Sequence, residues 1–277
     1  MNTECKILIT GGSGMVGSQV NFGIKPTHYE LDITDISSVE NYIEKNKPSV
    51  VFHFAALADM SLCEQNPDDA YRVNVLGTEN IAKACKKHGI KLVYLSTCVV
   101  FDGKKETPYN ENDKVGPISM YGKTKIEGEN VIQSILTDAL IIRTGWLFGG
   151  GKNDKKFIRA FYLKISANEE INAVSDRYGS PTYVPDLIDA ILELLKENKN
   201  GIYHVVNSGS VTYKEVAEKI KFLTGSTSNI NPINSANVDN PFIIRSKMES
   251  LYSSKITLRP WNESVTAYID ILRQDSF

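Results

Sequence analysis

Tyr121 and Lys125 are four residues apart in a stretch with helical spacing, so both side chains should lie on one face of a helix. A lysine ammonium beside a phenol lowers the pKa of the phenol below its ordinary value of about 10. Such a tyrosine can pass a proton to a substrate near neutral pH. Because the chain has 13 tyrosines, this spacing alone equally describes an ordinary solvated helix face. Ser96 and Thr97, at the end of a predicted strand, make the combination more specific.

A second candidate feature is a glycine loop. Gly11, Gly14 and Gly17 have the spacing G-x-x-G-x-x-G and directly follow the apolar run Lys6 to Thr10. Glycines at such positions allow a tight turn, let a diphosphate approach the backbone and let the next helix pack closely. The N-terminus of that helix then offers free N–H groups to negative charge. Placed after a first strand, the loop predicts a dinucleotide site, although a purely structural turn would use the same residues.

The identity of the dinucleotide is normally decided at the end of the second strand, which here would be a minimal one at His28 to Leu31. An acidic residue there binds the ribose 2′-hydroxyl of NAD, and a basic residue receives the 2′-phosphate of NADP. Asp32 lies close to the expected position, but Lys25 and His28 are near it. NADPH and NADH therefore both stay open, with NADPH slightly favoured. Asp32 or Asp35 could instead cap the following helix.

The elements that must position these residues alternate along the first half of the chain. Buried strands are predicted from continuous apolar runs at Lys6 to Thr10, Val50 to Phe54, Leu92 to Ser96 and Leu140 to Thr144. Helices are predicted at Ser37 to Asn46, Asp68 to His88 and Ser119 to Ile135. This order predicts an α/β fold with a doubly wound parallel sheet of Rossmann type. We expect a dinucleotide-binding domain over residues 1–150 and a smaller C-terminal α/β substrate domain over 151–277, with the chain crossing between them.

Composition excludes several functional classes. The 277 residues include 31 basic and 33 acidic side chains, which gives a net charge of -2 and no electrostatic footprint for nucleic acid. The cysteines form no Cys-x-x-Cys pair and no metal site is predicted; they are Cys5, Cys63, Cys85 and Cys98. No apolar run is long enough for a signal peptide or a membrane span, so we expect a cytoplasmic protein. His53 and His204 lie in apolar strand surroundings and are interpreted as core residues.

Together these motifs resemble those of extended short-chain dehydrogenases/reductases and, within them, the dTDP-4-dehydrorhamnose reductase family. The resemblance covers nearly the whole chain. Besides the glycine loop, it rests on Leu31-Asp32-Ile33-Thr34, Ala55-Ala56, Cys63-Glu64, Val73-Asn74, Leu95-Ser96-Thr97, Val100-Phe101-Asp102-Gly103, Tyr121-Gly122-Lys123-Thr124-Lys125, Arg143-Thr144-Gly145-Trp146, Gly179-Ser180-Pro181-Thr182 and Arg259-Pro260-Trp261-Asn262-Glu263-Ser264.

The resemblance implies reduction of the 4-keto group of a nucleotide-linked 4-keto-6-deoxy sugar by NAD(P)H. Tyr121 would donate the proton, Thr97 would bond the substrate carbonyl oxygen, and Lys125 would hold the nicotinamide ribose and tune Tyr121. Trp146 would contact the sugar. The other implied cofactor contacts are Gly11, Gly14, Met15, Val16 and Gly17 along the diphosphate, Asp32 and Ile33 by the adenine, and Ala55, Ala56 and Leu57 near the middle.

Departures from the family pattern fall on the substrate side. Where the family usually has Ser-Thr-Asp-Tyr, this chain has Ser96-Thr97-Cys98-Val99, and the family's Asp-Gln-x-Gly is Asp176-Arg177-Tyr178-Gly179. Cys98 and Arg177 are therefore expected substrate contacts of altered type. The family's Arg-Pro before the last helices is Asn240-Pro241, with Arg245 as a substitute.

Two other functions remain open at this point. One is a sugar-nucleotide epimerase or dehydratase on the same scaffold. The other is a catalytically silent, dinucleotide-binding regulatory subunit like the beta subunit of methionine adenosyltransferase. In every case the expected partner is a small-molecule ligand and not a membrane, and the helices at Asp68 to His88 and Ser119 to Ile135 could pair in a homodimer.

Overall fold

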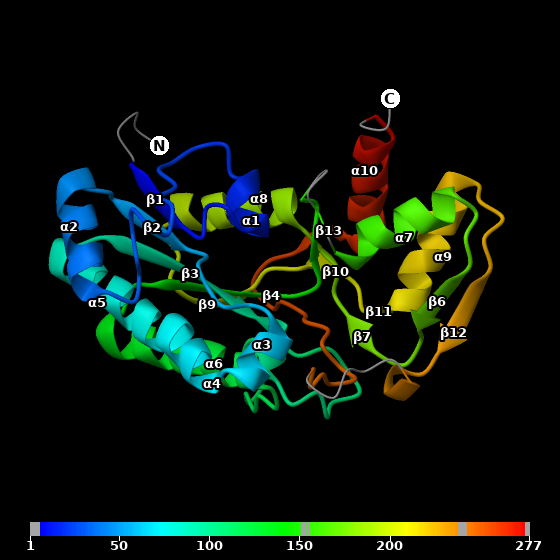
Figure 1. Ribbon diagram of the computed structural model, residues 1–277, viewed down its shortest axis with the longest axis horizontal. Helices are drawn as coiled ribbons and strands as arrows, with labels where there is room; N and C mark the ends of the chain where they lie inside the picture. The colour runs from blue at the N-terminus through cyan, green and yellow to red at the C-terminus, as the bar shows by residue number, and fades with distance from the viewer. Residues whose placement is uncertain (1–5, 151–153, 155, 238–242, 275–277) are drawn as a thin grey trace.

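A five-stranded parallel sheet forms the larger part of the molecule in the computed structural model, which describes residues 6–150, 154, 156–237 and 243–274 (Figure 1). Its strands are β1 (Ile7–Thr10), β2 (Val50–His53), β3 (Lys91–Thr97), β4 (Leu140–Thr144) and β9 (Gly201–His204), paired in the order β1-β2-β3-β4-β9. Every neighbouring pair is parallel. The predicted doubly wound α/β fold is confirmed, and the four predicted strands lie within one residue of their predicted bounds.

The predicted strand at His28 to Leu31 is wrong. Among the described residues, only an isolated parallel bridge between Leu8 and Ile24 continues the sheet beyond β1. Pro26 follows at once and has no N–H to donate to a neighbouring strand. The next residues form a turn instead, in which the Glu30 carboxylate accepts hydrogen bonds from the backbone N–H and the hydroxyl of Thr27.

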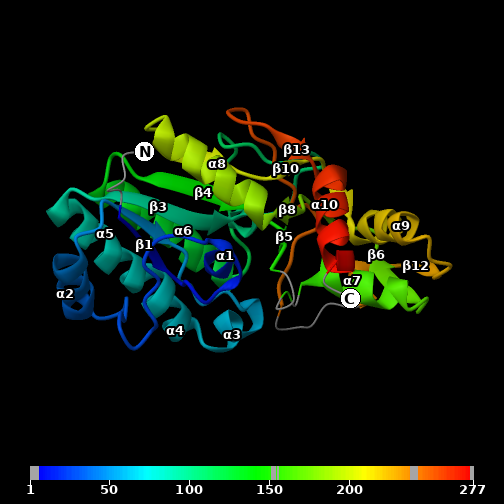
Figure 2. The same ribbon diagram turned by 90° about the horizontal axis from the view of Figure 1, so that it is seen from above.

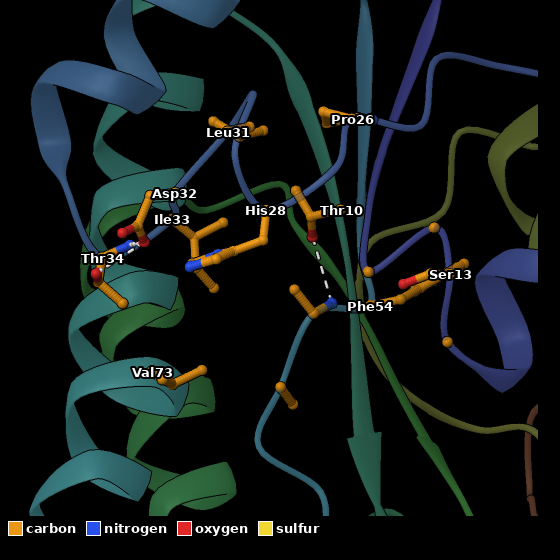
Figure 3. Close-up of a pocket in the computed structure, with 15 residues that line it drawn as sticks. Thr10, Ser13, Pro26, His28, Leu31, Asp32, Ile33, Thr34, Phe54 and Val73 are labelled. Carbon is orange, nitrogen blue, oxygen red and sulfur yellow. Dashed lines mark hydrogen bonds between the residues drawn. The ribbon is translucent and has the colours of Figure 1, made fainter.

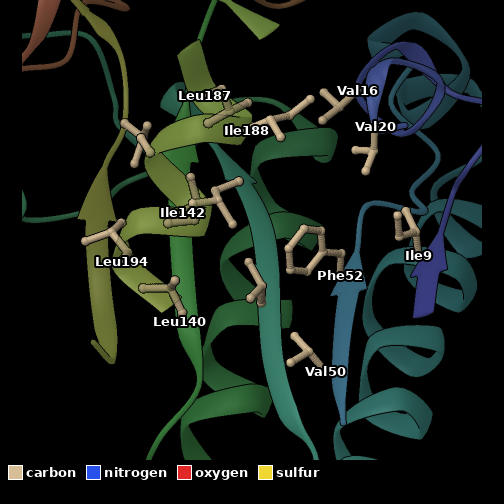
Figure 4. Close-up of a cluster of buried hydrophobic side chains, with 14 of the residues drawn as sticks. Ile9, Val16, Val20, Val50, Phe52, Leu140, Ile142, Leu187, Ile188 and Leu194 are labelled. Atoms are coloured by element: carbon tan, nitrogen blue, oxygen red, sulfur yellow. The ribbon is translucent and has the colours of Figure 1, made fainter. Parts of the chain in front are cut away.

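Helices cover both faces of the sheet. On one face lie α1 (Met15–Gln19) and α8 (Val184–Lys196), whose apolar residues pack against those of β1, β2 and β4 (Figure 4). On the other face lie α2 (Ile36–Asn46), α5 (Gly77–His88) and α6 (Met120–Ile135) (Figure 2). Strands covered on both faces are mostly apolar, and all residues of β1, β2 and β4 are buried.

The helix predicted over Asp68 to His88 is interrupted. It consists of α4 (Pro67–Tyr71), a π-helical segment over Arg72–Leu76 and α5, and it is preceded by α3 (Met60–Gln65). In the π-helical segment the buried Asn74 amide accepts a hydrogen bond from Leu57 N (2.8 Å) and donates to Leu57 O and to Thr124 Oγ1 (both 3.0 Å). This irregularity therefore ties the loop after β2 to helix α6.

A second apolar cluster lies beside the large sheet, at the other end of the molecule (Figures 1 and 2). It contains residues of α7 (Phe157–Ser166), α9 (Tyr213–Thr224), α10 (Trp261–Gln274) and β6 (Ile171–Val174), and β6 pairs with β12 (Ile230–Ile233). Because α8 and β9 pack with the large sheet, the chain after residue 150 contributes to both clusters. The boundary at residue 150 stays a prediction.

Three short strand pairs connect the two clusters. They are β5 (Leu147–Phe148) with β8 (Thr182–Tyr183), β7 (Tyr178–Gly179) with β11 (Val211–Thr212), and β10 (Asn207–Ser208) with β13 (Leu258–Pro260).

Of the described helices, none combines the length and the apolar character needed to cross a lipid bilayer.

Candidate active site

The glycine loop at the end of β1 makes close contact with the end of β2. Gly11 has φ +70°, and a Cβ atom there would lie 2.6 Å from the backbone nitrogen of Ala55. Gly14 N donates to Gly11 O at 3.0 Å, and Gly14 precedes α1 without any side-chain cap. The first N–H groups of α1 are therefore not satisfied by a capping side chain, as binding of a diphosphate requires.

A pocket of about 350 Å³ lies beside this loop (Figure 3). Six of the predicted cofactor contacts line it: Gly11, Gly14, Asp32, Ile33, Ala55 and Ala56. Thr10, Ser13, Pro26, His28, Phe54 and Val73 are among the lining residues that complete it. Its place at the carboxyl ends of β1 and β2 is where open parallel sheets bind dinucleotides.

Six predicted cofactor contacts are not among the residues that line this pocket: Met15, Val16, Gly17, Leu57, Tyr121 and Lys125. The side chain of Val16 is buried in the core against α8, Met15 packs against the same cluster, and Gly17 lies beneath the turn, near Gly11 O. Leu57 continues the loop after β2 and is held by Asn74. Contacts of these residues with a cofactor stay predictions.

Asp32 stands at the edge of the pocket. Its Oδ1 accepts hydrogen bonds from Thr34 N (2.9 Å) and Thr34 Oγ1 (2.8 Å), drawn in Figure 3. The backbone hydrogen bond of Thr34 holds the pKa of Asp32 below its usual value, and the positive charges of His28 and Arg72 lower it further. Partial burial raises the pKa and opposes these effects only in part. Asp35 is the residue that caps α2, through Ser37 N at 2.9 Å. The two aspartates thus have separate structural roles.

Thr97, at the carboxyl end of β3, comes together with Tyr121, near the start of α6, and Lys125 lies one turn further along that helix. Helix α6 begins at the Ser119 cap, whose hydroxyl accepts from Gly122 N at 3.1 Å. A Cβ atom at Gly122 would lie 2.3 Å from Val99 O, so the helix lies directly against the turn that follows Thr97. This close approach is what brings Tyr121 within hydrogen-bonding reach of the Thr97 side chain.

The predicted lowering of the Tyr121 pKa is wrong for this structure. Burial raises the pKa of the Tyr121 phenol well above its usual value, Cys98 and Cys63 act in the same direction, and the hydrogen bond with Thr97 only partly opposes them. The ammonium of Lys125 instead lies over the ring of Tyr94, with Nζ 3.8 Å from the ring centroid. The cost of burying a charged phenolate therefore outweighs the influence expected from the lysine.

Lys125 is itself nearly inaccessible, with 2% of its surface exposed. Burial lowers the pKa of Lys125 to about 7, and the Glu129 carboxylate one helical turn away opposes that shift. Glu129 is in turn bound by Arg143, whose Nε lies 3.0 Å from Oε1 and whose terminal nitrogen lies 2.6 Å from Oε2. The Ser96 hydroxyl also donates to Glu129. A buried ion pair thus lies directly behind the three candidate catalytic residues.

Of the altered substrate-side residues, Cys98 is buried next to Gly145, and burial raises the pKa of its thiol to about 12. Arg177 is buried as well and donates from Nε to Ser246 O at 3.1 Å. Trp146, at the end of β4, donates from its indole nitrogen to Glu249. Sequence reasoning missed Tyr94 and Glu249, because no local pattern links either residue to the site.

The remaining candidates have ordinary structural explanations. His53 is a satisfied core residue as predicted: its two ring nitrogens bond Thr10 Oγ1 (2.7 Å) and Thr78 Oγ1 (3.0 Å). His204 is buried too, but only Nδ1 has partners, while Nε2 has none among the described residues. Asn240 and Pro241 lie outside the described residues.

Comparison with known proteins agrees with this geometry. The family model described as "RmlD substrate binding domain" matches residues 5–274. The chain belongs to this family. A spore coat polysaccharide biosynthesis protein, SpsK, of Bacillus subtilis is 32% identical, over 95% of this chain and 96% of that protein. The predicted family membership is thereby confirmed.

Two solved structures of this family are similar over nearly their full length. A dTDP-4-dehydrorhamnose reductase of Clostridium acetobutylicum has a TM-score of 0.89 at 33% identity, covering 97% of this chain and 99% of that one. A dTDP-4-dehydrorhamnose reductase of Bacillus anthracis in complex with NADP has a TM-score of 0.89 at 30% identity, covering 96% and 98%.

Proposed function

We propose that this chain is an NAD(P)H-dependent reductase of the 4-keto group of a nucleotide-linked 4-keto-6-deoxy sugar, converting dTDP-4-dehydrorhamnose to dTDP-L-rhamnose. The observation that carries the proposal is the hydrogen bond between Thr97, at the carboxyl end of β3, and Tyr121, near the start of α6, with Lys125 one turn further along that helix. The dinucleotide pocket at the neighbouring strand ends and the full-length similarity to dTDP-4-dehydrorhamnose reductases support it.

The residues present fit a nicotinamide dinucleotide, since the pocket joins an open helix N-terminus to a carboxylate at its far side. A bound NAD(P)H supplies the hydride that reduces the sugar carbonyl carbon. Tyr121 donates its phenolic proton to the carbonyl oxygen as negative charge develops there, and Thr97 donates a second hydrogen bond to that oxygen. The product is the alcohol, and Tyr121 regains its proton from water.

Burial gives Tyr121 and Lys125 complementary tasks. Because burial raises the pKa of Tyr121, the phenol stays protonated until a substrate oxygen accepts its proton. Burial lowers the pKa of Lys125 to about 7, so keeping its ammonium charged costs free energy. A phenolate or a polar cofactor group nearby would offset that cost. We therefore assign Lys125 to the cofactor side of the site, where it would hold the nicotinamide ribose.

The test is the consumption of NADPH or NADH, followed by absorbance, with dTDP-4-keto-6-deoxy sugar as substrate and the 3,5-epimerase present. We expect steady consumption that Tyr121→Phe reduces at least about 100-fold, as loss of a general acid does. Tyr252→Phe is the matched control, since that tyrosine is 60% exposed, and it should keep full activity.

Absence of turnover in the wild-type protein would contradict the proposal. Conversion of a sugar nucleotide without net cofactor consumption would favour an epimerase or dehydratase. Tight cofactor binding without any turnover would favour the regulatory subunit. We also propose a cytoplasmic location. A homodimer formed through α4, α5 and α6 is proposed as well, and sedimentation of the purified protein would test the homodimer.

A further inference from the structure

The backbone of Trp146 is strained. Its φ of +43° lies in the left-handed region, which bulky side chains avoid because Cβ approaches the carbonyl oxygen. The other described non-glycine residues with positive φ are Lys47, Asn168 and Asn198, and all three are exposed just after a helix. Trp146 is 9% exposed, so its conformation persists only because surrounding contacts hold it.

Three separate segments hold the indole ring. The ring of Tyr213, from α9, lies against it at a centroid separation of 4.1 Å, and Phe157 from α7 meets it edge-on at 5.5 Å. Gly179, in β7, leaves room for the ring, because a Cβ atom there would lie 1.9 Å from the indole. These contacts fix the plane of the ring, but the indole Nε1–H group still needs a hydrogen-bond acceptor.

Glu249 satisfies that edge. The indole Nε1 donates to Glu249 Oε2 at 2.7 Å, and Glu249 is only 2% exposed. Arg245 binds the same carboxylate through two nitrogens, with Nε 3.0 Å from Oε1, and its third nitrogen donates to the Tyr213 hydroxyl at 2.7 Å. Trp146, Glu249, Arg245 and Tyr213 therefore form a closed ring of contacts, which we call the tryptophan clamp.

The tryptophan clamp adjoins the candidate catalytic residues. A Cβ atom at Gly145 would lie 2.8 Å from Cys98 Sγ, and Cys98 directly follows Thr97. Trp146 and Thr97 are thus linked through the contact between their chain neighbours, Gly145 and Cys98.

We propose that Glu249 is a positioning residue for substrate binding, which holds the Trp146 indole in its strained orientation so that the ring forms one wall for the sugar. This inference rests on the proposed function, because that function places the sugar beside Thr97 and Tyr121. The neutral indole N–H needs an acceptor, not a negative charge, so a glutamine should replace Glu249 in this role, whereas an alanine should not.

The test compares Glu249→Gln and Glu249→Ala with wild type. We expect Glu249→Ala to raise KM for the sugar nucleotide about tenfold, as loss of one buried hydrogen bond does, while kcat and the Kd for NADPH change less than about twofold. Glu249→Gln should restore KM to within about threefold of wild type. Asp186→Asn is the matched control, since Asp186, on α8, forms an equally bidentate pair with Arg259, in β13. This variant should leave KM unchanged.

A second readout does not depend on activity. The chain has two tryptophans, so labelling with 5-fluorotryptophan gives two fluorine signals that Trp261→Phe assigns. The Trp146 signal should shift in Glu249→Ala and stay in place in Glu249→Gln and Asp186→Asn. An unchanged Trp146 signal or an unchanged KM in Glu249→Ala overturns the inference, as does a Glu249→Gln variant that behaves like the alanine variant.

Glu249→Gln and Glu249→Ala both leave Arg245 without its counter-charge, so either variant could fail to fold. Trp146→Phe removes the indole N–H and leaves the pair between Arg245 and Glu249 intact. It should then raise KM about as much as Glu249→Ala, and normal KM in this variant overturns the inference. A wild-type protein without turnover contradicts the proposed function but does not test the role of Glu249. The fluorine signal still reports whether Glu249 holds Trp146.

Discussion

The ammonium of Lys125 lies 3.8 Å from the centroid of the Tyr94 ring, so a lysine of α6 rests on an aromatic side chain of β3. Both residues are almost completely buried. Gly128, one turn further along α6, allows this packing, because a Cβ atom there would lie 2.4 Å from the Tyr94 hydroxyl oxygen. A cation over an aromatic face is stabilised most when water is excluded.

Replacing Tyr94 should therefore test how Lys125 is held. Tyr94→Phe keeps the ring and should change kcat less than about twofold. Tyr94→Leu removes it, and loss of a desolvated cation–π contact of about 2 kcal/mol should lower kcat about tenfold or more. Steady-state kinetics at saturating cofactor measure both variants. Equal kcat values for the leucine and phenylalanine variants would show that the ring does not position the lysine.

The glycine loop makes a separate prediction about cofactor affinity. Gly11→Ala places a Cβ atom 2.6 Å from Ala55 N and forces the turn away from β2, so the Kd for NADPH should rise more than about tenfold. Gly89→Ala is the matched control. Gly89 has a similar φ of +64° but nothing lies within 4 Å of the added atom. It should lose about 1 kcal/mol of stability and keep its Kd. Similar Kd changes in both variants would attribute the effect to backbone strain alone.

Removing one partner of the buried ion pair between Glu129 and Arg143 should lower the free energy of unfolding. The two side chains are 1% and 4% exposed, and Glu129→Gln leaves the guanidinium buried without its counter-charge. We expect a loss of about 3 kcal/mol or more in the free energy of unfolding, measured in urea. Glu79→Gln removes the exposed pair with Lys83 and should cost less than about 1 kcal/mol. A loss that small at Glu129 would contradict the prediction.

Acid should destabilise the fold in part through the buried His53. Burial lowers the pKa of His53 to about 3, below its ordinary value of about 6.5 in the unfolded chain. Between these two values the unfolded chain binds the proton and the folded chain does not, so stability rises with pH across that window and is lost as pH falls from about 6.5 to about 3. His53→Gln, which can still bond Thr10 and Thr78, should flatten this part of the profile in denaturant titrations at several pH values. An identical slope in wild type and variant would exclude His53 as the cause.

Much of this protein could be predicted from short stretches of sequence. The apolar runs of β1 to β4, the spacing of Gly11, Gly14 and Gly17, and the pairing of Tyr121 with Lys125 are local features, because strand burial, turn geometry and helix periodicity are decided within a few residues. These features were sufficient to predict the parallel sheet and the pocket beside the glycine loop. The roles of Thr97, Tyr121 and Lys125 stay predictions.

Other properties were decided only by tertiary structure. The hydrogen bond between Trp146 and Glu249 joins residues 103 positions apart, and the ring beneath Lys125 comes from a different element. The predicted lowering of the Tyr121 pKa failed for the same reason, since the pKa depends on how completely the folded chain excludes water. Helix and strand periodicity determine which residues can face one another, whereas packing over long range determines which charges are buried and what each one contacts.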